Sequence, residues 1–307
     1  MKLVFYDDFK LGVMNGDTVV DAASAVSGIH HHSPQDLLNQ LIENFSQYRS
    51  NLEELARQGT GVPVNSVRLR SPMPKPNNIV AMAVNYMEDG TRAEPAPINA
   101  FHKSANSVIG NGDTMILPDV PAAIFEGEAE MALVIGKRAS HVSADDAYDY
   151  IFGYLNFIDG SARGLPPAGN TFYQMKSRET FAPMGPWLVT ADEISDPHNL
   201  QIRLSVNEEL KQNFNTSDMA HNIPRVIEWV SSIHTLEPGD VIATGTNHRG
   251  LSAFQDGDHI DLEVDGLGVL HFNVQDELKR TWARETRLDR ADKGLEGTTP
   301  QISGKYS

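Results

Sequence analysis

The sequence predicts an α+β protein in which a small N-terminal α/β domain precedes a longer, β-rich domain. Three observations lead to this prediction: short β-type segments in residues 2–21, a helical pattern in residues 33–59, and a succession of strand and turn signals from residue 76 onward. With 307 residues, the chain is long enough to bury one large core or two unequal ones.

The first domain is expected to span residues 1–75. The dipeptide Asn15-Gly16 favours a tight hairpin turn between short strands. A helix is then expected from Ser33, which can serve as its N-cap, to Gly59, which can end it. The apolar residues that recur along this helix are Leu37, Leu38, Leu41, Ile42 and Phe45. The Pro- and Asn-rich residues 71–78 mark the boundary with the next domain.

The β-rich domain is expected over residues 76–280. Its strand signals are "EAEMALVIG", "GPWLVT", "LQIRLSVNEEL", "DVIATGT" and "HIDLEVDGLGVLHFNV". Two helices interrupt these strands, one beginning at Ser143 and one in "IPRVIEWVSSIH". One face of the second helix carries Val226, Ile227, Val230 and Ile233. The polar residues 281–307 form a C-terminal extension, which we expect to wrap the protein surface or a partner subunit.

The composition excludes several classes of function. A formal net charge of −16 argues against nucleic acids and anionic membranes as partners, because binding them requires Lys and Arg to neutralise phosphate charge. The absence of cysteine excludes disulfides, zinc–thiolate sites and thiol nucleophiles. The sequence has no secretory signal, no apolar stretch long enough for a membrane helix and no Gly-rich nucleotide-binding motif. A cytoplasmic location is therefore expected.

The stretch "FEGEAEMALVIGK", residues 125–137, carries glutamates at alternate positions. In a strand, Glu126, Glu128 and Glu130 share one face, and Ala129, Met131, Leu133 and Ile135 face the other way. Aligned carboxylates next to a core repel one another and lose solvation unless a cation cancels their charge. Hard cations such as Mg²⁺, Mn²⁺ or Ca²⁺ prefer such oxygen ligands. The alternative is an edge strand whose acidic face is solvated.

A second acidic position favours the metal site. The nearly apolar run "YIFGYLNFIDGSARG" ends in Asp159, which closes a segment that should be buried. Arg163 follows as a cation that can hold a carboxylate or an anionic ligand. A simple Asp-Gly turn is the alternative interpretation.

The sequence resembles the fumarylacetoacetate hydrolase (FAH) family over about residues 76–275. The blocks that carry the resemblance, in chain order, are "AVNYMEDG", "FHKSANSVIGNGD", "EAEMALVIGK", "YIFGYLNFIDGSAR", "QMKSRETFAPMGPWLV", "LEPGDVIATGT" and "DGDHIDLEVDGLG". The resemblance implies a mixed β-roll or sandwich core, with the N-terminal segment as the small domain that many members carry. It also suggests a homodimer.

The resemblance further implies roles for individual residues. The metal ligands are Glu128, Glu130 and Asp159, with Glu126 outside the group that binds the ion. Lys176 matches the family lysine that faces the metal-bound substrate and is expected to be catalytic. The expected substrate-binding residues are Arg163, whose role in the family can also be structural, Thr246, Tyr86 and Gln174.

Two blocks depart from the family pattern. Many members have a water-activating His and Glu in the "NY" block, where this sequence has Asp89 and Arg92, although Glu88 keeps the acidic position before them. The block "TGTNHRG" replaces the commoner "TGTP.G" and brings His248 and Arg249 towards the mouth of the site.

The histidines and one lysine leave open alternatives. His248 could act as a general base, or it could be a solvated loop residue. Glu88 is a further catalytic candidate. His102 near the expected lid has the same two interpretations, and Lys103 is expected to be structural. The run His30–His32 is interpreted as a solvated loop before a helix cap.

These observations lead to one expected function and its alternatives. We expect a divalent-metal-dependent hydrolase that cleaves a carbon–carbon bond in a small β-diketo or acylpyruvate-type 2-keto acid through a metal-stabilised enolate. Mg²⁺ is the expected ion, with Mn²⁺ or Ca²⁺ as alternatives. An isomerase, decarboxylase or dehydratase acting at the same site, or a metal-binding relative without activity, is the alternative function.

Overall fold

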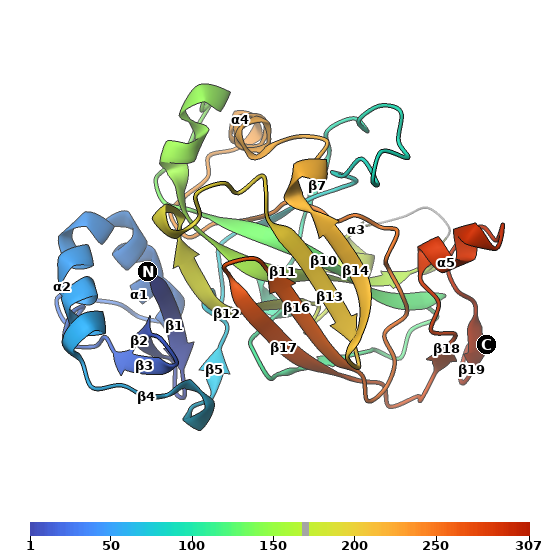
Figure 1. The fold of residues 1–307 in the computed structure, drawn as a ribbon, viewed down its shortest axis with the longest axis horizontal. Coiled ribbons are helices and arrows are strands. Elements are labelled where there is room, and N and C mark those ends of the chain that lie inside the picture. Colours follow the sequence, from blue (N-terminus) through green and yellow to red (C-terminus); the bar gives the residue numbers. More distant parts are fainter. Residues whose placement is uncertain (168–171) are drawn as a thin grey trace.

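The computed structural model describes residues 1–167 and 172–307, which form a mixed α/β structure built on two β-sheets (Figure 1). The larger sheet contains, in spatial order, β4 (Val62–Pro63), β3 (Thr18–Asp21), β2 (Lys10–Asn15), β1 (Lys2–Tyr6), β12 (Ala182–Thr190), β11 (Ile151–Arg163), β10 (Ile124–Ile135), β15 (Val241–Ala243), β6 (Ile79–Met82) and β7 (Ala100–His102), while β5 (Leu69–Arg70) pairs with β1 and β8 (Val108–Ile109) with β12. The predicted α+β class with a mixed β core is therefore confirmed.

The second sheet lies in front of β10 and β11 in Figure 1. Its strands are β14 (Glu209–Asn215), β13 (Gln201–Val206), β16 (His259–Val264), β17 (Gly268–Gln275) and β9 (Thr114–Ile116). The strands β18 (Thr281–Trp282) and β19 (Gln301–Ser303) form a small separate pair. The α-helices are α1 (Pro34–Glu43), α2 (Phe45–Gln58), α3 (Phe172–Lys176), α4 (Ile223–Ile233) and α5 (Arg287–Asp292). Short 3₁₀ helices are η1 (Val64–Ser66), η2 (Ala105–Ser107), η3 (Ala144–Tyr150), η4 (Ala191–Glu193) and η5 (Thr216–Asp218).

The strand β10 lies inside the core, and the two faces of its C-terminal half pack into different apolar clusters. Met131 and Leu133 belong to the cluster that includes the inner face of the second sheet. Ala132 and Val134 belong to the cluster beneath β1 and α1. This alternation is the period of two expected for a strand, and Met131 and Leu133 share one face as predicted.

The N-terminal segment extends the main sheet, because β1 pairs antiparallel with β12. Leu3 and Phe5 of β1 belong to the same apolar cluster as Leu155 and Phe157 of β11. Asn15 lies at the end of β2, so the expected hairpin turn is present. Residues 1–75 thus share a sheet and a core with the rest of the chain, and a domain boundary at residue 75 stays a prediction.

The structure corrects three details of the predicted helices. The helix expected from Ser33 to Gly59 is divided at Asn44, whose side-chain amide donates to the carbonyl oxygen of Gln40 and so competes with helix continuation. The helix expected at Ser143 is the 3₁₀ helix η3, and the apolar residues after it belong to β11. Ile233 is 63% exposed at the end of α4, so it is not part of that helix's buried face.

None of the helices in the described part of the chain has both the length and the apolar character needed to span a bilayer.

A fully buried ion pair lies directly before the C-terminal extension. The guanidinium of Arg280 contacts both carboxylate oxygens of Asp276, donates to the carbonyl oxygens of Val120 and Pro118, and lies 4.6 Å from the ring centroid of Phe125. Removing one partner of such a pair leaves an uncompensated buried charge.

We therefore expect Arg280→Met to lower the free energy of unfolding by about 3–5 kcal/mol. Urea denaturation followed by circular dichroism measures this loss. The control is Arg203→Met, which removes a half-exposed pair with Asp265 and should cost at most about 1 kcal/mol. Equal losses in the two variants would contradict the prediction.

Candidate active site

Three buried carboxylates meet where β10 and β11 lie side by side. Glu128 is directly opposite Asp159 in the antiparallel register, and Glu130 lies two residues further along β10. One carboxylate oxygen from each residue lies within 4.8 Å of those of the other two. All twelve residues of β10 are buried, and the strand lies between β11 and β15. The alternative of a solvated acidic edge strand is therefore wrong.

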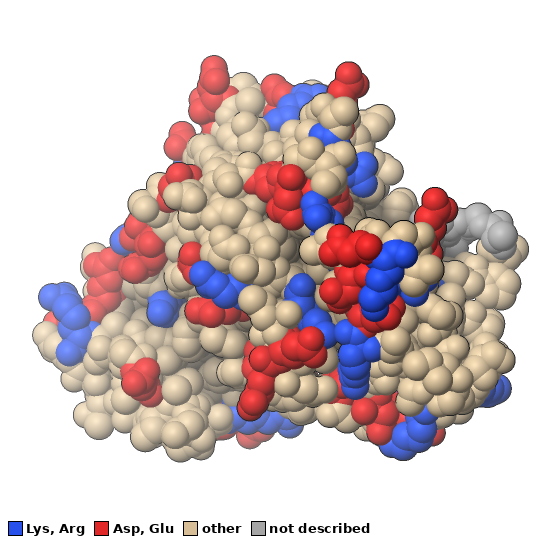
Figure 2. Space-filling model, turned by 45° about the vertical axis from the view of Figure 1, so that its right-hand side comes forward, with Lys and Arg blue, Asp and Glu red and all other residues tan. Residues whose placement is uncertain are grey.

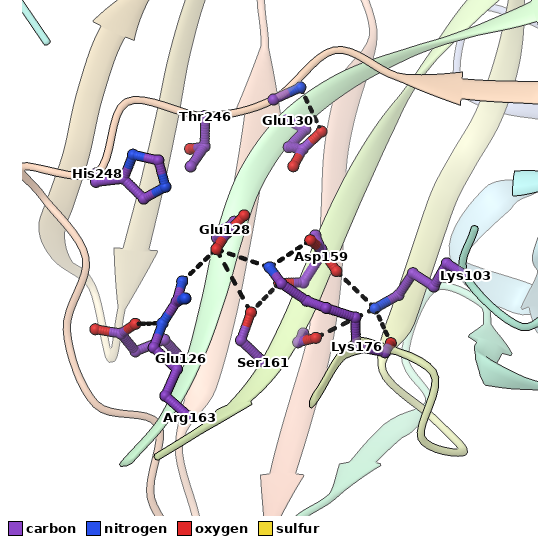
Figure 3. Close-up of polar contacts among 12 residues, drawn as sticks. Lys103, Glu126, Glu128, Glu130, Asp159, Ser161, Arg163, Lys176, Thr246 and His248 are labelled. Atoms are coloured by element: carbon purple, nitrogen blue, oxygen red, sulfur yellow. Dashed lines mark hydrogen bonds and ion pairs between the residues drawn. The ribbon is translucent and has the colours of Figure 1, made fainter. Parts of the chain in front are cut away.

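Glu126 lies on the same strand, β10, but its carboxylate binds arginines and is not one of the three grouped carboxylates. Its carboxylate binds the guanidinium of Arg163, and it accepts hydrogen bonds of 3.1 and 2.6 Å from Arg287 of α5. Arg163 also binds Glu128, so it joins Glu126 to the carboxylate group (Figure 3). In this structure Arg163 holds protein carboxylates, one of the two roles expected for it.

Two buried lysines contact the carboxylate group. The ammonium nitrogen of Lys176 lies 2.8 Å from Oε1 of Glu128 and 2.5 Å from Oδ2 of Asp159. The ammonium nitrogen of Lys103 lies 2.6 Å from Oδ1 of Asp159 and also donates to the main-chain oxygen of Lys176. Lys103 therefore positions both Asp159 and the segment that carries Lys176, which agrees with its expected structural role and makes it part of the site.

The carboxylates differ in their surroundings and therefore in their pKa values. Burial favours a higher pKa for Glu128, but the positive charges of Lys176 and Arg163 outweigh it and hold the pKa well below its usual value. Burial, together with the negative charges of Asp159 and Glu128, raises the pKa of Glu130 well above its usual value. Among the described residues, no Lys or Arg forms an ion pair with Glu130 that would cancel its charge.

The residues fit a hard divalent cation. Oε2 of Glu130 accepts a hydrogen bond of 2.7 Å from the main-chain N–H of Gly245, whereas the buried Oε1 has no hydrogen-bond partner among the described residues. Gly245 has a φ of +90°, and a Cβ atom there would lie 2.9 Å from Cβ of Asn85. An unpaired buried carboxylate oxygen beside two other carboxylates is the oxygen-rich environment that Mg²⁺, Mn²⁺ and Ca²⁺ prefer.

Thr246 lies on the loop that follows β15. Its hydroxyl donates to the carbonyl oxygen of Ala129 at 2.7 Å and accepts from the side-chain amide of Gln212 at 2.9 Å. Gln212 in turn accepts from the main-chain N–H of Ala129. These bonds attach the loop to β10, and they leave the hydroxyl of Thr246 already engaged within the protein.

His248 forms a pair with Glu88, although the two residues are 160 positions apart. Nδ1 of His248 lies 2.6 Å from Oε1 of Glu88, and its main-chain N–H donates to Oε2 at 2.9 Å. If Nδ1 carries the proton, Nε2 is the ring nitrogen that can accept another. Figure 3 shows the ring directed towards Glu128 from the side of the group opposite Lys176. His248 is thus held in place by Glu88, and the interpretation as a freely solvated loop residue is wrong.

The His248–Glu88 pair makes a pH-dependent contribution to stability. Burial raises the pKa of Glu88. The hydrogen bond with His248 and the charge of His248 together lower the pKa by more than burial raises it, so it lies below its usual value of 4.5. A carboxyl group whose pKa falls on folding stabilises the native state above its unfolded pKa and loses this effect as the pH falls through the folded pKa.

We therefore expect Glu88→Gln to lower the free energy of unfolding by about 1–2 kcal/mol at pH 7. The difference from the wild-type protein should shrink as the pH falls below 4.5 and vanish once the pH is below the lowered pKa of Glu88. Urea denaturation at pH 7, 5 and 3.5 measures it. A difference that stays constant down to pH 3.5 would contradict this origin.

Two further predicted site residues, Tyr86 and Gln174, form no hydrogen bond with the three carboxylates in the described part of the chain. Tyr86 is completely buried, packs edge-on against Phe214 at 5.0 Å, and its hydroxyl has no hydrogen-bond partner among the described residues. The negative charge of Glu130 contributes, after burial, to a raised pKa of Tyr86, so the two residues are near each other. Gln174 of α3 lines a separate cavity of about 550 Å³ together with Tyr173. Their expected roles in substrate binding stay predictions.

Other histidines lie outside the group. The ring of His102 packs against His234 at 5.4 Å. The run His30–His32 is exposed, as expected for a solvated loop before α1.

Two contacts of the site were missed from the sequence. Ser161, two residues after Asp159 on β11, lies 3.5 Å from Glu128, and the i, i+2 spacing of a strand was an available signal for it. Arg287 reaches Glu126 from the polar C-terminal extension, where no periodicity or motif distinguished it from neighbouring arginines.

Comparison with known proteins supports the resemblance to the fumarylacetoacetate hydrolase family. The profile of the family described as fumarylacetoacetate (FAA) hydrolase C-terminal matches residues 78–275. A maleylpyruvate hydrolase of Aquipseudomonas alcaligenes is 32% identical over 291 residues, covering 90% of this chain and 99% of that protein. An oxaloacetate tautomerase of Bacillus subtilis is 38% identical over 219 residues, covering 67% of this chain and 73% of that protein.

A solved structure extends the comparison to the fold. The maleylpyruvate hydrolase of Sphingobium sp. SYK-6, whose crystals contain manganese(II) and pyruvate, has a TM-score of 0.81 and 34% sequence identity. The alignment covers 90% of this chain and 99% of that one. With a family profile over most of the chain and relatives matched along nearly their full length, the chain belongs to the fumarylacetoacetate hydrolase family and is an enzyme of that family.

Proposed function

We propose that this enzyme hydrolyses a carbon–carbon bond in an acylpyruvate-type 2-oxo acid. The observation that carries the proposal is the combination of a buried three-carboxylate group with Lys176 on one side and the His248–Glu88 pair on the other. The similarity to two maleylpyruvate hydrolases over 90% of this chain supports hydrolysis within the broader chemistry of the family.

Glu128, Glu130 and Asp159 would hold a divalent cation, of which Mg²⁺ and Mn²⁺ are the first candidates and Ca²⁺ the third. Such an ion, when bound, acts as a Lewis acid towards the oxygens of a chelating 2-oxo carboxylate. The related structure that contains both manganese(II) and pyruvate supports this choice of ligand class.

The protein's own groups have separate tasks in this reaction. Water adds to the acyl carbonyl carbon, the bond between that carbon and the pyruvate methylene breaks, and its electron pair forms the pyruvate enolate. His248, held by Glu88, accepts the proton of the water. Lys176 supplies positive charge where the enolate forms. Protonation of the enolate carbon completes the products, a carboxylic acid and pyruvate.

Keto–enol isomerisation of a 2-oxo acid is the second candidate. It needs the same enolate stabilisation and a single proton transfer between carbon and oxygen, without addition of water. Asp89 and Arg92 stand where many family members have the water-activating pair, and a tautomerase is 38% identical to this chain. Decarboxylation and dehydration have no comparable observation in their favour.

The homodimer expected from the resemblance stays a prediction.

The test compares acylpyruvate cleavage with oxaloacetate tautomerisation, each with and without Mg²⁺ or Mn²⁺, for the wild-type protein and His248→Asn. We expect metal-dependent acylpyruvate cleavage that falls by about 10²–10⁴-fold in the variant.

The matched control is His30→Asn, which changes an exposed histidine before α1 and should not alter turnover. Cleavage that is unaffected in His248→Asn would contradict the role of this pair. Tautomerisation without any cleavage would replace hydrolysis by the second candidate.

A further inference from the structure

We propose that His259, Asp261 and His271 bind a divalent transition-metal ion, with Zn²⁺ as the first candidate, on the outer face of the second sheet. One ligand atom from each of the three residues lies within 4.8 Å of those of the other two. This group is separate from the buried carboxylate group on β10 and β11, and the inference does not depend on the reaction that the enzyme catalyses.

The strand register brings the three side chains together. His259 and Asp261 are two residues apart on β16, so both point to the same side of the sheet. Asp261 lies directly opposite His271 in the antiparallel pairing of β16 with β17. Ile260 and Phe272, the next residues along each strand, are fully buried in the core, which places the three polar side chains on the outer face. The backbone supports this arrangement because β16 is paired on both edges, with β13 and with β17.

The distances between the three side chains suit an ion of the size of Zn²⁺. Oδ1 of Asp261 lies 3.1 Å from Nε2 of His259 and 2.5 Å from Nδ1 of His271. The two imidazole rings are inclined by only 19°, with their centroids 5.9 Å apart. Zn²⁺ binds imidazole nitrogen and carboxylate oxygen at about 2.0–2.2 Å, so two ligand atoms on one tetrahedral ion lie about 3.3–3.6 Å apart. Small side-chain rotations therefore suffice to place the three ligand atoms around one ion.

Two asparagines hold the histidines in place. Oδ1 of Asn273, which is opposite His259 in the register, lies 3.2 Å from Nδ1 of His259. If Nδ1 carries the proton, it donates to Asn273, and the lone pair is on Nε2, the nitrogen next to Asp261. A metal-binding imidazole commonly donates its other N–H to such an oxygen, which fixes the ring. The main-chain N–H of His271 donates to Oδ1 of Asn111 at 2.9 Å.

The chemistry of the ligands distinguishes this group from the buried carboxylates. Two imidazole nitrogens and one carboxylate suit Zn²⁺ and its transition-metal neighbours, whereas oxygen ligands alone suit Mg²⁺, Mn²⁺ or Ca²⁺. The side chains of His259 and His271 are 48% and 46% exposed, so an ion can reach them from solvent. Asp and Glu side chains are spread over the face shown in Figure 2, in line with the net charge of −16, and they attract cations to the protein.

The first test counts bound Zn²⁺ by calorimetric titration and by metal content after dialysis. The proteins compared are the wild type, His271→Asn, Glu130→Gln and the double variant Glu130→Gln/His271→Asn. We expect each protein that keeps His271 to bind one more Zn²⁺ per chain than its counterpart without it. The comparison is made in both backgrounds, so it holds whether or not the carboxylate group also binds Zn²⁺. Asn273→Ala should weaken Zn²⁺ binding at this site by about 10–100-fold, because Asn273 orients His259.

Stability gives a second readout, since an ion that joins β16 to β17 binds only the folded protein. Zn²⁺ should raise the urea midpoint of Glu130→Gln but not that of the double variant Glu130→Gln/His271→Asn. With EDTA present, the two proteins should unfold at similar urea concentrations, because the side chain of His271 is half-exposed. Circular dichroism follows the unfolding and shows that both variants are folded before Zn²⁺ is added.

The matched control is His141→Asn, which changes an exposed histidine outside the second sheet and should leave both readouts unchanged. Equal Zn²⁺ stoichiometry with and without His271 in both backgrounds would overturn the site and leave the three residues as a hydrogen-bonded network only. A urea midpoint of Glu130→Gln that does not respond to Zn²⁺ would overturn it as well. Neither result bears on the proposed function, which the acylpyruvate comparison tests separately.

Discussion

Replacing Glu130 by Gln should reduce kcat/KM by at least about a thousandfold, the scale expected when a group that stabilises the transition state electrostatically is lost. The variant should also lose the tight binding of Mg²⁺ or Mn²⁺. In the wild-type site, three carboxylates lie against the cations of Lys103, Lys176 and Arg163. Without the charge of Glu130, the cations outnumber the carboxylates, and the site repels a divalent ion. Steady-state kinetics and calorimetric titration with Mn²⁺ measure the two effects.

The metal-free Glu130→Gln protein provides the control for folding. Burial disfavours the charged form of Glu130, so the neutral amide should leave the free energy of unfolding unchanged or raise it when EDTA is present. Added Mn²⁺ should stabilise the wild-type protein but not the variant, because only an ion that binds the native state raises its stability. Wild-type turnover in the variant would refute the assignment of Glu130 as a ligand.

Replacing Lys176 by Met should also reduce kcat/KM by about a thousandfold, but for a different reason. The ammonium group of Lys176 contacts Glu128 and Asp159 and supplies the charge that the proposed enolate needs. Its removal takes a competing cation away from both carboxylates, so the affinity for Mn²⁺ should be retained or increased. Together, the two variants separate loss of the ion from loss of catalysis. Kinetics at saturating Mn²⁺ and calorimetric titration make this comparison.

The matched control for Lys176→Met is Lys211→Met, a buried lysine that pairs with Glu209 and donates to the carbonyl oxygen of Arg284. This control should lose stability without a comparable loss of turnover at saturating Mn²⁺. If Lys176→Met lost Mn²⁺ binding as completely as Glu130→Gln, its effect on activity would be structural, and the proposed role in stabilising the enolate would be wrong.

The sequence alone determined the local part of this site. An extended backbone directs residues i and i+2 to the same side, so the spacing of Glu128 and Glu130 was sufficient to predict that both point to one place. The apolar residues around Asp159 predicted its burial, and the order of motifs predicted the family and the participation of Lys176. These inferences succeeded because they depend on the local period of a strand or on a matched motif.

Only the tertiary structure decided which distant residues meet. The i, i+2 spacing places Glu126 on the same face as Glu128 and Glu130. In the folded protein, Arg287 of the C-terminal extension forms an ion pair with Glu126, and this contact separates Glu126 from the other two carboxylates. The contact between His248 and Glu88 depends on how two loops 160 residues apart approach each other across the ends of β6 and β15. Local propensity contains no information on such contacts, because strand register and the packing of one segment against another set them.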